Sequence, residues 1–431
     1  MDIQQTANQC KTASISMSSL SAEIKNKALA NIISALKTNE SAIREANKND
    51  LERARKENLD RPLLKRLKFD SAKRSEACDG IESLIRLADP VGTTLNAVEL
   101  DNGLELYKVS RPIGVIGVIF ESRPDALVQI AALCLKSGNA VLLKGGSEAS
   151  ETNQVLAQII HAAGVDAGCP AGWLGLLETR SDVDRMLQLD QAVDLIIPRG
   201  SNAFVKYIMD HTRIPVLGHA DGICHLYIDR LADPDMAVEL AVDSKTQYVA
   251  VCNAIETILV HRDVADEMLP KLKTALEQKQ VSILGCGKTQ AIIDVDSAGE
   301  KDWQTEYLDL IVSIRVVDSL DQGLSHINQY GSGHTDVIVT TDKSRALYFM
   351  DRADTADVFW NCSSRFSDGF RFGLGAEVGV STNKIHARGP VGLEGLMIYQ
   401  WRMMGNGHRV KDYVGEDAKP FSHTPIDKEF S

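Results

Sequence analysis

The segment Arg111-Pro-Ile-Gly-Val-Ile-Gly-Val-Ile-Phe120 is almost continuously apolar. Strands of that composition are covered on both faces, as in a parallel sheet. The segment runs into Glu121-Ser122-Arg123-Pro124, and a helix is predicted from Asp125 to Ser137. A second apolar strand, Ala140–Leu143, then meets Lys144-Gly145-Gly146-Ser147. This order of strand, helix and strand predicts a βαβ unit, the building block of an α/β fold.

The same alternation continues along the chain, with strands predicted at Gly172–Leu177, Ala192–Ile197 and Cys224–Ile228. It indicates a doubly wound parallel sheet of Rossmann type. Sites in such sheets lie beyond the carboxyl ends of the strands. The residues expected at such ends are Arg123, Lys144, Arg199 and Gly200.

A second α/β unit is predicted around Cys252, which is followed by an apolar strand at Ile255–Val260. A helix at Val264–Gln278 and a strand at Val281–Leu284 come next, and Glu306–Val317 contains a further strand. We therefore expect a cofactor-binding domain over residues 1–243 and a catalytic domain over residues 244–381. Residues 382–431 are expected to return to the first domain.

Two further features frame these domains. Amphipathic helices are predicted from about Ala7 to Leu87. Asn102-Gly103, between flanks that alternate apolar and polar, predicts a hairpin over about residues 95–110. A lone hairpin is marginally stable, so we expect it to pair outside its own domain, in a subunit contact. The polar tail Asp417–Ser431 is expected to be frayed.

Composition narrows the class of protein. The 431 residues exceed what one core accommodates, and the net charge of −12 argues against nucleic acid or an anionic membrane as the main partner. No apolar run reaches the length of a bilayer span, and Met1–Ser21 lacks the pattern of a signal peptide. Eight scattered cysteines without metal-ligand spacing indicate a reducing cytoplasm and no structural metal.

Three features carry candidate chemistry. A thiolate at Cys252 would be a strong nucleophile, although a lone cysteine is more often a small buried apolar residue. His334, in a Gly-Ser-Gly-His loop, is a candidate for phosphate binding or proton transfer, and a loop histidine bonded to Asp336 or to backbone is the alternative. Cys224-His225 is interpreted as one buried and one exposed strand position.

Glycine and cation tracts suggest binding loops. The turns at Lys144-Gly145-Gly146-Ser147 and Arg199-Gly200-Ser201 would let backbone approach a nucleotide, unless they are ordinary strand-to-helix turns. The tract Arg365–Glu394 includes Arg371 and Glu377 and is rich in glycine and cations. It is interpreted as a loop that covers an anionic substrate, with a surface linker as the alternative.

From about Ala7 to Arg409 the chain resembles the glutamate-5-semialdehyde dehydrogenases, or γ-glutamyl phosphate reductases, a distant branch of the aldehyde dehydrogenase superfamily. Several tracts together carry the resemblance: Arg111–Pro124, Cys134–Gly146, Ile197–Gly200, Cys252–Thr257, His326–Ile338 and Arg365–Glu394. The resemblance implies an aldehyde-dehydrogenase-like fold with a cofactor domain, a catalytic domain and a small β element for oligomerisation, formed by the hairpin and a C-terminal strand near His408.

The resemblance also implies a reaction, in which L-glutamyl 5-phosphate and NADPH give L-glutamate 5-semialdehyde, phosphate and NADP⁺ for proline biosynthesis. Cys252 would be the nucleophile that displaces phosphate and forms a thioester. Asn253 and nearby backbone N–H groups are candidates for the oxyanion site. Arg123 would hold the acyl phosphate or the α-carboxylate. Ser122 stands near the position of the superfamily's oxyanion asparagine, and Ser122, His334, Arg365, Arg371 and Glu377 are further expected substrate-binding residues.

The expected direction of reaction depends on a departure from the hydrolytic relatives. Those enzymes carry a glutamate that activates water, whereas His219 stands at that position in His219-Ala-Asp-Gly222. A reductase has to avoid hydrolysis of its thioester, which agrees with the loss of the glutamate, although His219 is itself a potential base. The alternative activity is an oxidative aldehyde dehydrogenase for a small acidic aldehyde, and a catalytically silent α/β binding protein is a third.

The cofactor expectation rests on the residue three after Lys144. An acidic residue there meets the adenosine ribose in NAD-dependent relatives, whereas this chain has Ser147, which leaves room for a 2′-phosphate. The neighbouring Glu148 is acidic and therefore disfavours a 2′-phosphate. Lys144, Gly145, Gly146, Ser147, Arg199, Gly200 and Ser201 are the expected cofactor-binding residues. A homo-oligomer and a contact with glutamate 5-kinase are the expected protein partners.

Overall fold

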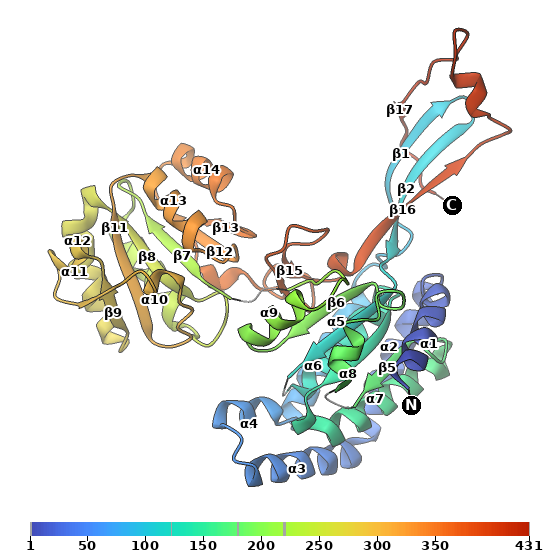
Figure 1. Cartoon of the computed structure of the whole chain (residues 1–431), viewed down its shortest axis with the longest axis horizontal. Coiled ribbons are helices and arrows are strands. Elements are labelled where there is room, and N and C mark those ends of the chain that lie inside the picture. The colour runs from blue at the N-terminus through green and yellow to red at the C-terminus, as the bar shows by residue number, and fades with distance from the viewer. Residues whose placement is uncertain (1, 122, 179–180, 219–220, 431) are drawn as a thin grey trace.

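The computed structural model describes residues 2–121, 123–178, 181–218 and 221–430 (Figure 1). It has two α/β bodies and a projecting β arm, each with its own sheet. The first body holds a parallel sheet in the order β5-β4-β3-β6. Its strands are β3 (Val115–Phe120), β4 (Ala140–Gly145), β5 (Leu174–Leu177) and β6 (Leu195–Arg199). Every residue of β3 and β4 is buried, which explains their unbroken apolar sequences.

Helices cover both faces of this sheet. Ile116 and Val118 of β3 face a core shared with α2, α5, α6 and α7, while Val115 and Ile119 face α1, α8 and α9. The helices of this body are α1 (Ile3–Met17), α2 (Ala22–Thr38), α3 (Glu40–Lys56), α4 (Arg61–Leu67), α5 (Ser71–Arg86), α6 (Pro124–Lys136), α7 (Ser150–Ala167), α8 (Ser181–Met186) and α9 (Asn202–Asp210). The predicted three-layer α/β architecture is confirmed.

The second body holds a seven-stranded parallel sheet in the order β10-β9-β11-β8-β7-β12-β13. Its strands are β7 (Cys224–Ile228), β8 (Ile255–His261), β9 (Ser282–Gly285), β10 (Asp296–Ser297), β11 (Ile311–Val317), β12 (Thr335–Val339) and β13 (Asp357–Trp360). Its helices are α10 (Pro234–Thr246), α11 (Arg262–Gln278), α12 (Gly287–Gln290), α13 (Leu320–Tyr330) and α14 (Lys343–Arg352).

The position of β7 corrects the expected domain boundary. We placed residues up to 243 in the first domain, yet β7 pairs with β8 and β12 in the middle of the second sheet. Strand–helix alternation is the same on both sides of the boundary, so the sequence pattern does not reveal which sheet a strand joins. The second body therefore begins before Cys224.

The expectation for Cys224-His225 is also wrong, because both side chains are fully buried. A strand in the centre of a sheet with helices on both faces has no exposed side. His225 Nδ1 instead bonds Asp336 Oδ1 at 2.9 Å.

The arm is an antiparallel sheet in the order β16-β2-β1-β17 that projects from the first body (Figure 1). Its strands are β1 (Thr94–Asp101), β2 (Leu104–Pro112), β16 (Met397–Met404) and β17 (Thr424–Pro425). The hairpin predicted at Asn102-Gly103 is confirmed, with Gly103 at φ +74°. The C-terminal strand expected near His408 lies just before it, at β16.

Two other local predictions are wrong. Residues 111–120 form the end of β2 and then β3, because the chain bends at Gly114, which has φ +135°. A Cβ at Gly114 would lie 2.2 Å from Asp194 Oδ2, so the bend requires glycine. The C-terminal tail is not frayed throughout, since β17 pairs with β1 and Phe430 packs edge-on against Tyr107.

The segment between the second body and the arm packs on the first body. Val378, Val391 and Leu396 join the core formed by α2, α5 and α6. This segment contains the short pair β14 (Gly379–Ser381) and β15 (Gly389–Val391). Five 3-10 turns complete the described elements: η1 (Ser147–Ala149), η2 (Asp302–Gln304), η3 (Ser364–Phe366), η4 (Glu394–Leu396) and η5 (Val410–Tyr413).

Candidate active site

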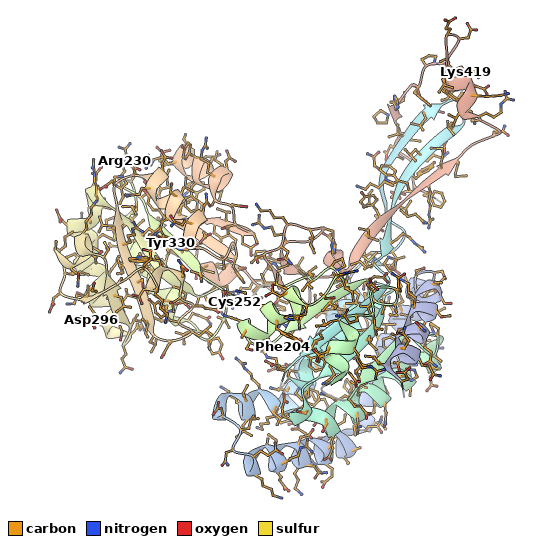
Figure 2. All side chains as sticks on the ribbon, in the orientation of Figure 1. Phe204, Arg230, Cys252, Asp296, Tyr330 and Lys419 are labelled. Carbon is orange, nitrogen blue, oxygen red and sulfur yellow. The ribbon has the colours of Figure 1, made fainter. Side chains whose placement is uncertain are left out.

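Cys252 lies on the loop between α10 and β8, at the edge of the second body near α9 (Figure 2). Its side chain is partly exposed. The Cys224 thiol donates to the Cys252 carbonyl oxygen at 3.1 Å, and burial raises the pKa of Cys224, which keeps that donor protonated. Gly222 lies directly against the Cys252 backbone, where a Cβ would be 2.4 Å from Cys252 Cα. These contacts fix the position of the Cys252 loop relative to the sheet.

His334 completes a thiol–imidazole pair with Cys252. It is fully buried immediately before β12, and its Nε2 lies 3.1 Å from Cys252 Sγ. Its Nδ1 lies 2.8 Å from Thr335 Oγ1. The expected alternative, a bond to Asp336, is wrong because that carboxylate bonds His225 and Thr355. An imidazole in this position is able to accept a thiol proton or stabilise a thiolate.

Asn253 is already hydrogen-bonded through both its side-chain amide and its backbone carbonyl. Its amide Nδ2 donates to the Ser367 carbonyl at 2.7 Å, and the Ser364 hydroxyl donates to the Asn253 carbonyl at 2.6 Å. Both bonds tie the Cys252 loop to the tract that begins at Arg365. Its proposed part in the oxyanion site therefore depends on the second amide hydrogen.

A cavity of about 320 Å³ opens beside Cys252, between the two sheets. It lies where the carboxyl ends of β3 and β6 face the amino end of β8. Seven of the residues predicted from the sequence line it: Arg123, Arg199, Gly200, Cys252, Asn253, Arg365 and Glu377. Tracts distant in the sequence are thus brought to one pocket.

The other predicted substrate residues do not all line this cavity. Arg371 does not line the cavity, and its Nη1 donates to the Arg365 carbonyl at 2.8 Å, which orients its neighbour. Arg365 is half-buried, and its Nε bonds Gln247 Oε1 at 2.9 Å. Burial lowers the pKa of Arg365, and the nearby Arg371 charge lowers it further. Ser122 and His219 lie outside the described residues.

Sequence reasoning missed several residues that line the cavity, namely Leu63, Arg66, Glu121, Asn202, Glu306 and Leu308. Asn202 Nδ2 donates to Glu306 Oε2 at 2.6 Å and so joins the first body to the second. Arg66 comes from α4, within a charged helical region that has no motif. Only Glu121 offered a signal, since it directly follows β3 at a carboxyl end.

The predicted cofactor residues form two groups. Lys144 ends β4, is almost fully buried, and its Nζ donates to the Gly145 carbonyl. Ser147 follows in η1, where Arg53 Nη2 lies 3.4 Å from its carbonyl oxygen and 3.0 Å from Ser150 Oγ. Gly145 and Gly146, at this strand end, have no side chains that could cover their own backbone.

The second group follows β6. Ser201 is the N-cap of α9, yet its side chain makes no capping bond, and its backbone N–H donates to Glu121 Oε2 at 3.1 Å. Lys144 and the α9 start thus flank β3 at one edge of the sheet. The structure therefore brings the two predicted groups of cofactor residues to the same edge of one sheet.

In the described ranges no three histidine, cysteine or acidic side chains are placed to hold a metal ion. No helix among the described residues is long and apolar enough to cross a membrane.

The fold and a cysteine between two α/β bodies define the aldehyde dehydrogenase class. Residues 1–284 match the sequence model of the aldehyde dehydrogenase family. An acetylating aldehyde dehydrogenase from Geobacillus thermoglucosidasius shares the fold, with a TM-score of 0.64 at 15% identity, over 94% of this chain and 96% of that chain.

More similar proteins give a narrower placement. A gamma-glutamyl phosphate reductase of Pelotomaculum thermopropionicum is 62% identical over 100% of this chain and 99% of its own. The crystal structure of gamma-glutamyl phosphate reductase from Thermotoga maritima is 38% identical, with a TM-score of 0.93 over 95% of this chain and 100% of that chain. The chain belongs to the gamma-glutamyl phosphate reductase family, a group of oxidoreductases within the aldehyde dehydrogenase superfamily.

Proposed function

We propose that this protein reduces L-glutamyl 5-phosphate to L-glutamate 5-semialdehyde and phosphate, with NADPH as the reductant, in proline biosynthesis. The observation that carries the proposal is the 3.1 Å approach of His334 Nε2 to Cys252 Sγ. The pair lies beside a cavity lined by arginines, in a chain whose relatives are named for this substrate.

The first step is attack of the Cys252 thiolate on the acyl phosphate carbonyl carbon. His334 takes the thiol proton, the C–S bond forms, and the bond from carbon to the phosphoryl oxygen breaks, so that phosphate leaves. The Cys252 backbone N–H and the second Asn253 amide hydrogen are the proposed donors to the developing oxyanion. Arg365 lines the same cavity as Cys252.

The second half of the reaction returns the thiol. NADPH, when bound, would supply the hydride that reduces the thioester carbon. As the C–S bond of the resulting tetrahedral anion breaks, its oxygen becomes the aldehyde carbonyl and the protonated His334 returns its proton to the Cys252 sulfur. Lys144, Ser147, Arg199, Gly200 and Ser201 are the residues proposed to hold the cofactor.

The charged groups of the substrate require partners at the cavity wall. We assign Arg123 to the acyl phosphate or the α-carboxylate, and Glu377, whose Oε2 accepts the Gly369 N–H at 2.7 Å, to the region of the α-ammonium. We place the enzyme in the cytoplasm, since all eight cysteines are free. A homo-oligomer formed through the arm is part of the proposal, and a contact with glutamate 5-kinase is a further one.

The test is the reverse reaction, with pyrroline-5-carboxylate (the cyclised semialdehyde), phosphate and NADP⁺, followed by NADPH absorbance. Wild type, Cys252→Ala and, as a matched control, Cys362→Ala are compared. Phosphate-dependent NADPH formation that Cys252→Ala abolishes and Cys362→Ala retains would support the proposal. NADPH formation without phosphate would replace it with the oxidative aldehyde dehydrogenase, and absence of both NADPH formation and NADPH binding would indicate a silent scaffold.

His334 is tested in the same assay. His334→Gln keeps a hydrogen-bonding side chain of similar length but removes the basic nitrogen. We expect a fall in kcat of roughly 10²-fold or more, because the proposed general base is removed. An unchanged kcat would assign proton transfer to another group.

A further inference from the structure

Three arginines from separate parts of the first body line the cavity beside Cys252. Arg66 is on α4, Arg123 follows β3, and Arg199 ends β6. Arg123 and Arg199 belong to tracts that the sequence singled out. Arg66 has no place in the function described so far, because nothing in its local sequence connects it with the other two.

None of the three guanidinium groups is in an ion pair with a described carboxylate. Arginines on the helices before and after α4 are paired, as Arg53 of α3 is with Asp50 and Glu151, and Arg74 of α5 is with Glu40 at 2.7 Å. Burial lowers the pKa of Arg123, and the neighbouring charges of Arg199 and Arg66 lower it further. Like charges gathered without a counterion are unfavourable unless an anion is bound between them.

The acidic groups that line the cavity form no ion pair with the three guanidinium groups among the described residues, and each accepts a hydrogen bond from another group. Glu121 accepts the Ser201 N–H, and Glu306 accepts Asn202 Nδ2. Asp368 accepts the Arg371 N–H at 3.0 Å, and Glu377 accepts the Gly369 N–H. The arginine cluster therefore remains available to a ligand.

The position of Arg66 is fixed by a buried side chain. Asn47 Nδ2 donates to the Leu67 carbonyl at 2.9 Å, and Asn47 Oδ1 accepts the Phe69 N–H at 2.8 Å. Leu67 is fully buried, so the end of α4 is anchored on α3. Leu63, three residues before Arg66 and on the same face, also lines the cavity. The guanidinium is thus presented by an anchored helix and not by a free surface loop.

We propose that Arg66 is a substrate-binding residue and that Arg66, Arg123 and Arg199 together bind a phosphate group. Three guanidinium forks match the several oxygens and double charge of a phosphate better than a single carboxylate. The group has two sources, the phosphoryl group of the acyl phosphate and the phosphates of the nucleotide. The assignment rests on the proposed function and deepens it.

The experiment compares wild type, Arg66→Gln, Arg66→Lys and a control, Lys65→Gln. Lys65 is the adjacent exposed cation of α4 and does not line the cavity, so its variant removes the same charge. KM is measured in the reverse reaction for phosphate, NADP⁺ and pyrroline-5-carboxylate separately. We expect Arg66→Gln to raise one phosphate-dependent KM by about tenfold or more, with a smaller rise for Arg66→Lys. Lys65→Gln should stay within about twofold of wild type.

The pattern of KM values identifies the source. A rise for phosphate alone assigns the cluster to the phosphoryl group, and a rise for NADP⁺ alone assigns it to the nucleotide. A rise only for pyrroline-5-carboxylate would overturn the phosphate assignment in favour of the α-carboxylate. Equal values for Arg66→Gln and Lys65→Gln would overturn the role of Arg66.

A binding readout separates this inference from the proposed function. Inorganic phosphate should slow alkylation of Cys252 by iodoacetamide, followed by mass spectrometry of the Cys252 peptide. The half-protecting phosphate concentration should rise about tenfold or more in Arg66→Gln and stay near wild type in Lys65→Gln. If the wild-type protein formed no NADPH, the proposed function would fail. The protection of Cys252 by phosphate would still show whether the arginine cluster binds phosphate. Equal protection in all variants would overturn the cluster as a site for inorganic phosphate.

Discussion

At the scale of single residues, Gly222 sets the position of Cys252, the proposed nucleophile. A methyl group there would lie 2.3 Å from the Cys252 carbonyl oxygen, so Gly222→Ala has to displace the loop. We expect kcat/KM to fall by about 10²-fold, because small misplacements of reacting groups have costs of this size. The rate of Cys252 alkylation should change with it. Gly287→Ala, where a Cβ meets nothing within 4 Å, is the control, and wild-type activity in Gly222→Ala would contradict this reading.

His326 provides a second prediction at this scale. Burial lowers its pKa from 6.5 to about 2, with contributions from the charges of His225 and Arg315. The unfolded chain therefore binds a proton below pH 6.5 that the folded protein does not, and folding stability falls as pH falls toward 2. The slope from this one group approaches about 1.4 kcal/mol per pH unit.

The variant His326→Gln removes the titrating group and retains a polar side chain next to Arg315. We expect the thermal midpoint of wild type to decline more steeply between pH 6.5 and 5 than that of the variant. Parallel curves for the two proteins would show that His326 is protonated in the folded state.

At the scale of elements, an ion pair holds the end of α10 against the start of β8, on both sides of the Cys252 loop. Lys245 Nζ lies 2.5 Å from Glu256 Oε2, and both side chains are fully buried. Burial raises the pKa of Glu256 and lowers that of Lys245, so each charge depends on the other. Loss of one partner leaves a buried charge unpaired.

We therefore expect Lys245→Met to cost roughly 3–5 kcal/mol of stability, whereas Lys245→Met with Glu256→Met is close to wild type. The measurement is the unfolding midpoint in urea for the two single variants and the double variant. Additive losses in the double variant would mean that the two groups do not interact. Cys252 alkylation in the same proteins reports whether the loop moves.

At the scale of the whole molecule, β16 is an edge strand of the projecting arm (Figure 1). It exposes large apolar side chains. Trp401 is 54% exposed and Met403 is 58% exposed. An edge of this kind is a template for pairing with another chain, which agrees with the proposed oligomer.

Charge on this edge should dissociate the oligomer. We expect Trp401→Glu with Met403→Glu to lower the molar mass measured by light scattering after gel filtration. Leu347→Glu, an equally exposed apolar position on α14, should not change it. An unchanged molar mass for the β16 variant would show that the subunit contact does not involve this edge.

Local patterns explain what was predictable in the fold. Unbroken apolar runs and glycine turns located β3, β4, β8 and the hairpin, because these signals arise within a few residues. The boundary between the two bodies was not predictable, since β7 resembles a strand of either sheet. The bend at Gly114 was missed because a glycine within an apolar run is compatible with a continuous strand as well as with a bend.

The sequence by itself determined the class of fold and placed Arg123, Lys144 and Arg199 at strand ends, because each of these features follows from neighbours in the chain. The proposed role of Cys252 as nucleophile came from the family resemblance and not from its neighbours. Only the tertiary structure decided that His334 approaches Cys252, that Gly222 supports it and that Arg66 reaches the cavity. Those contacts join segments far apart in the sequence, and packing between elements sets their distances.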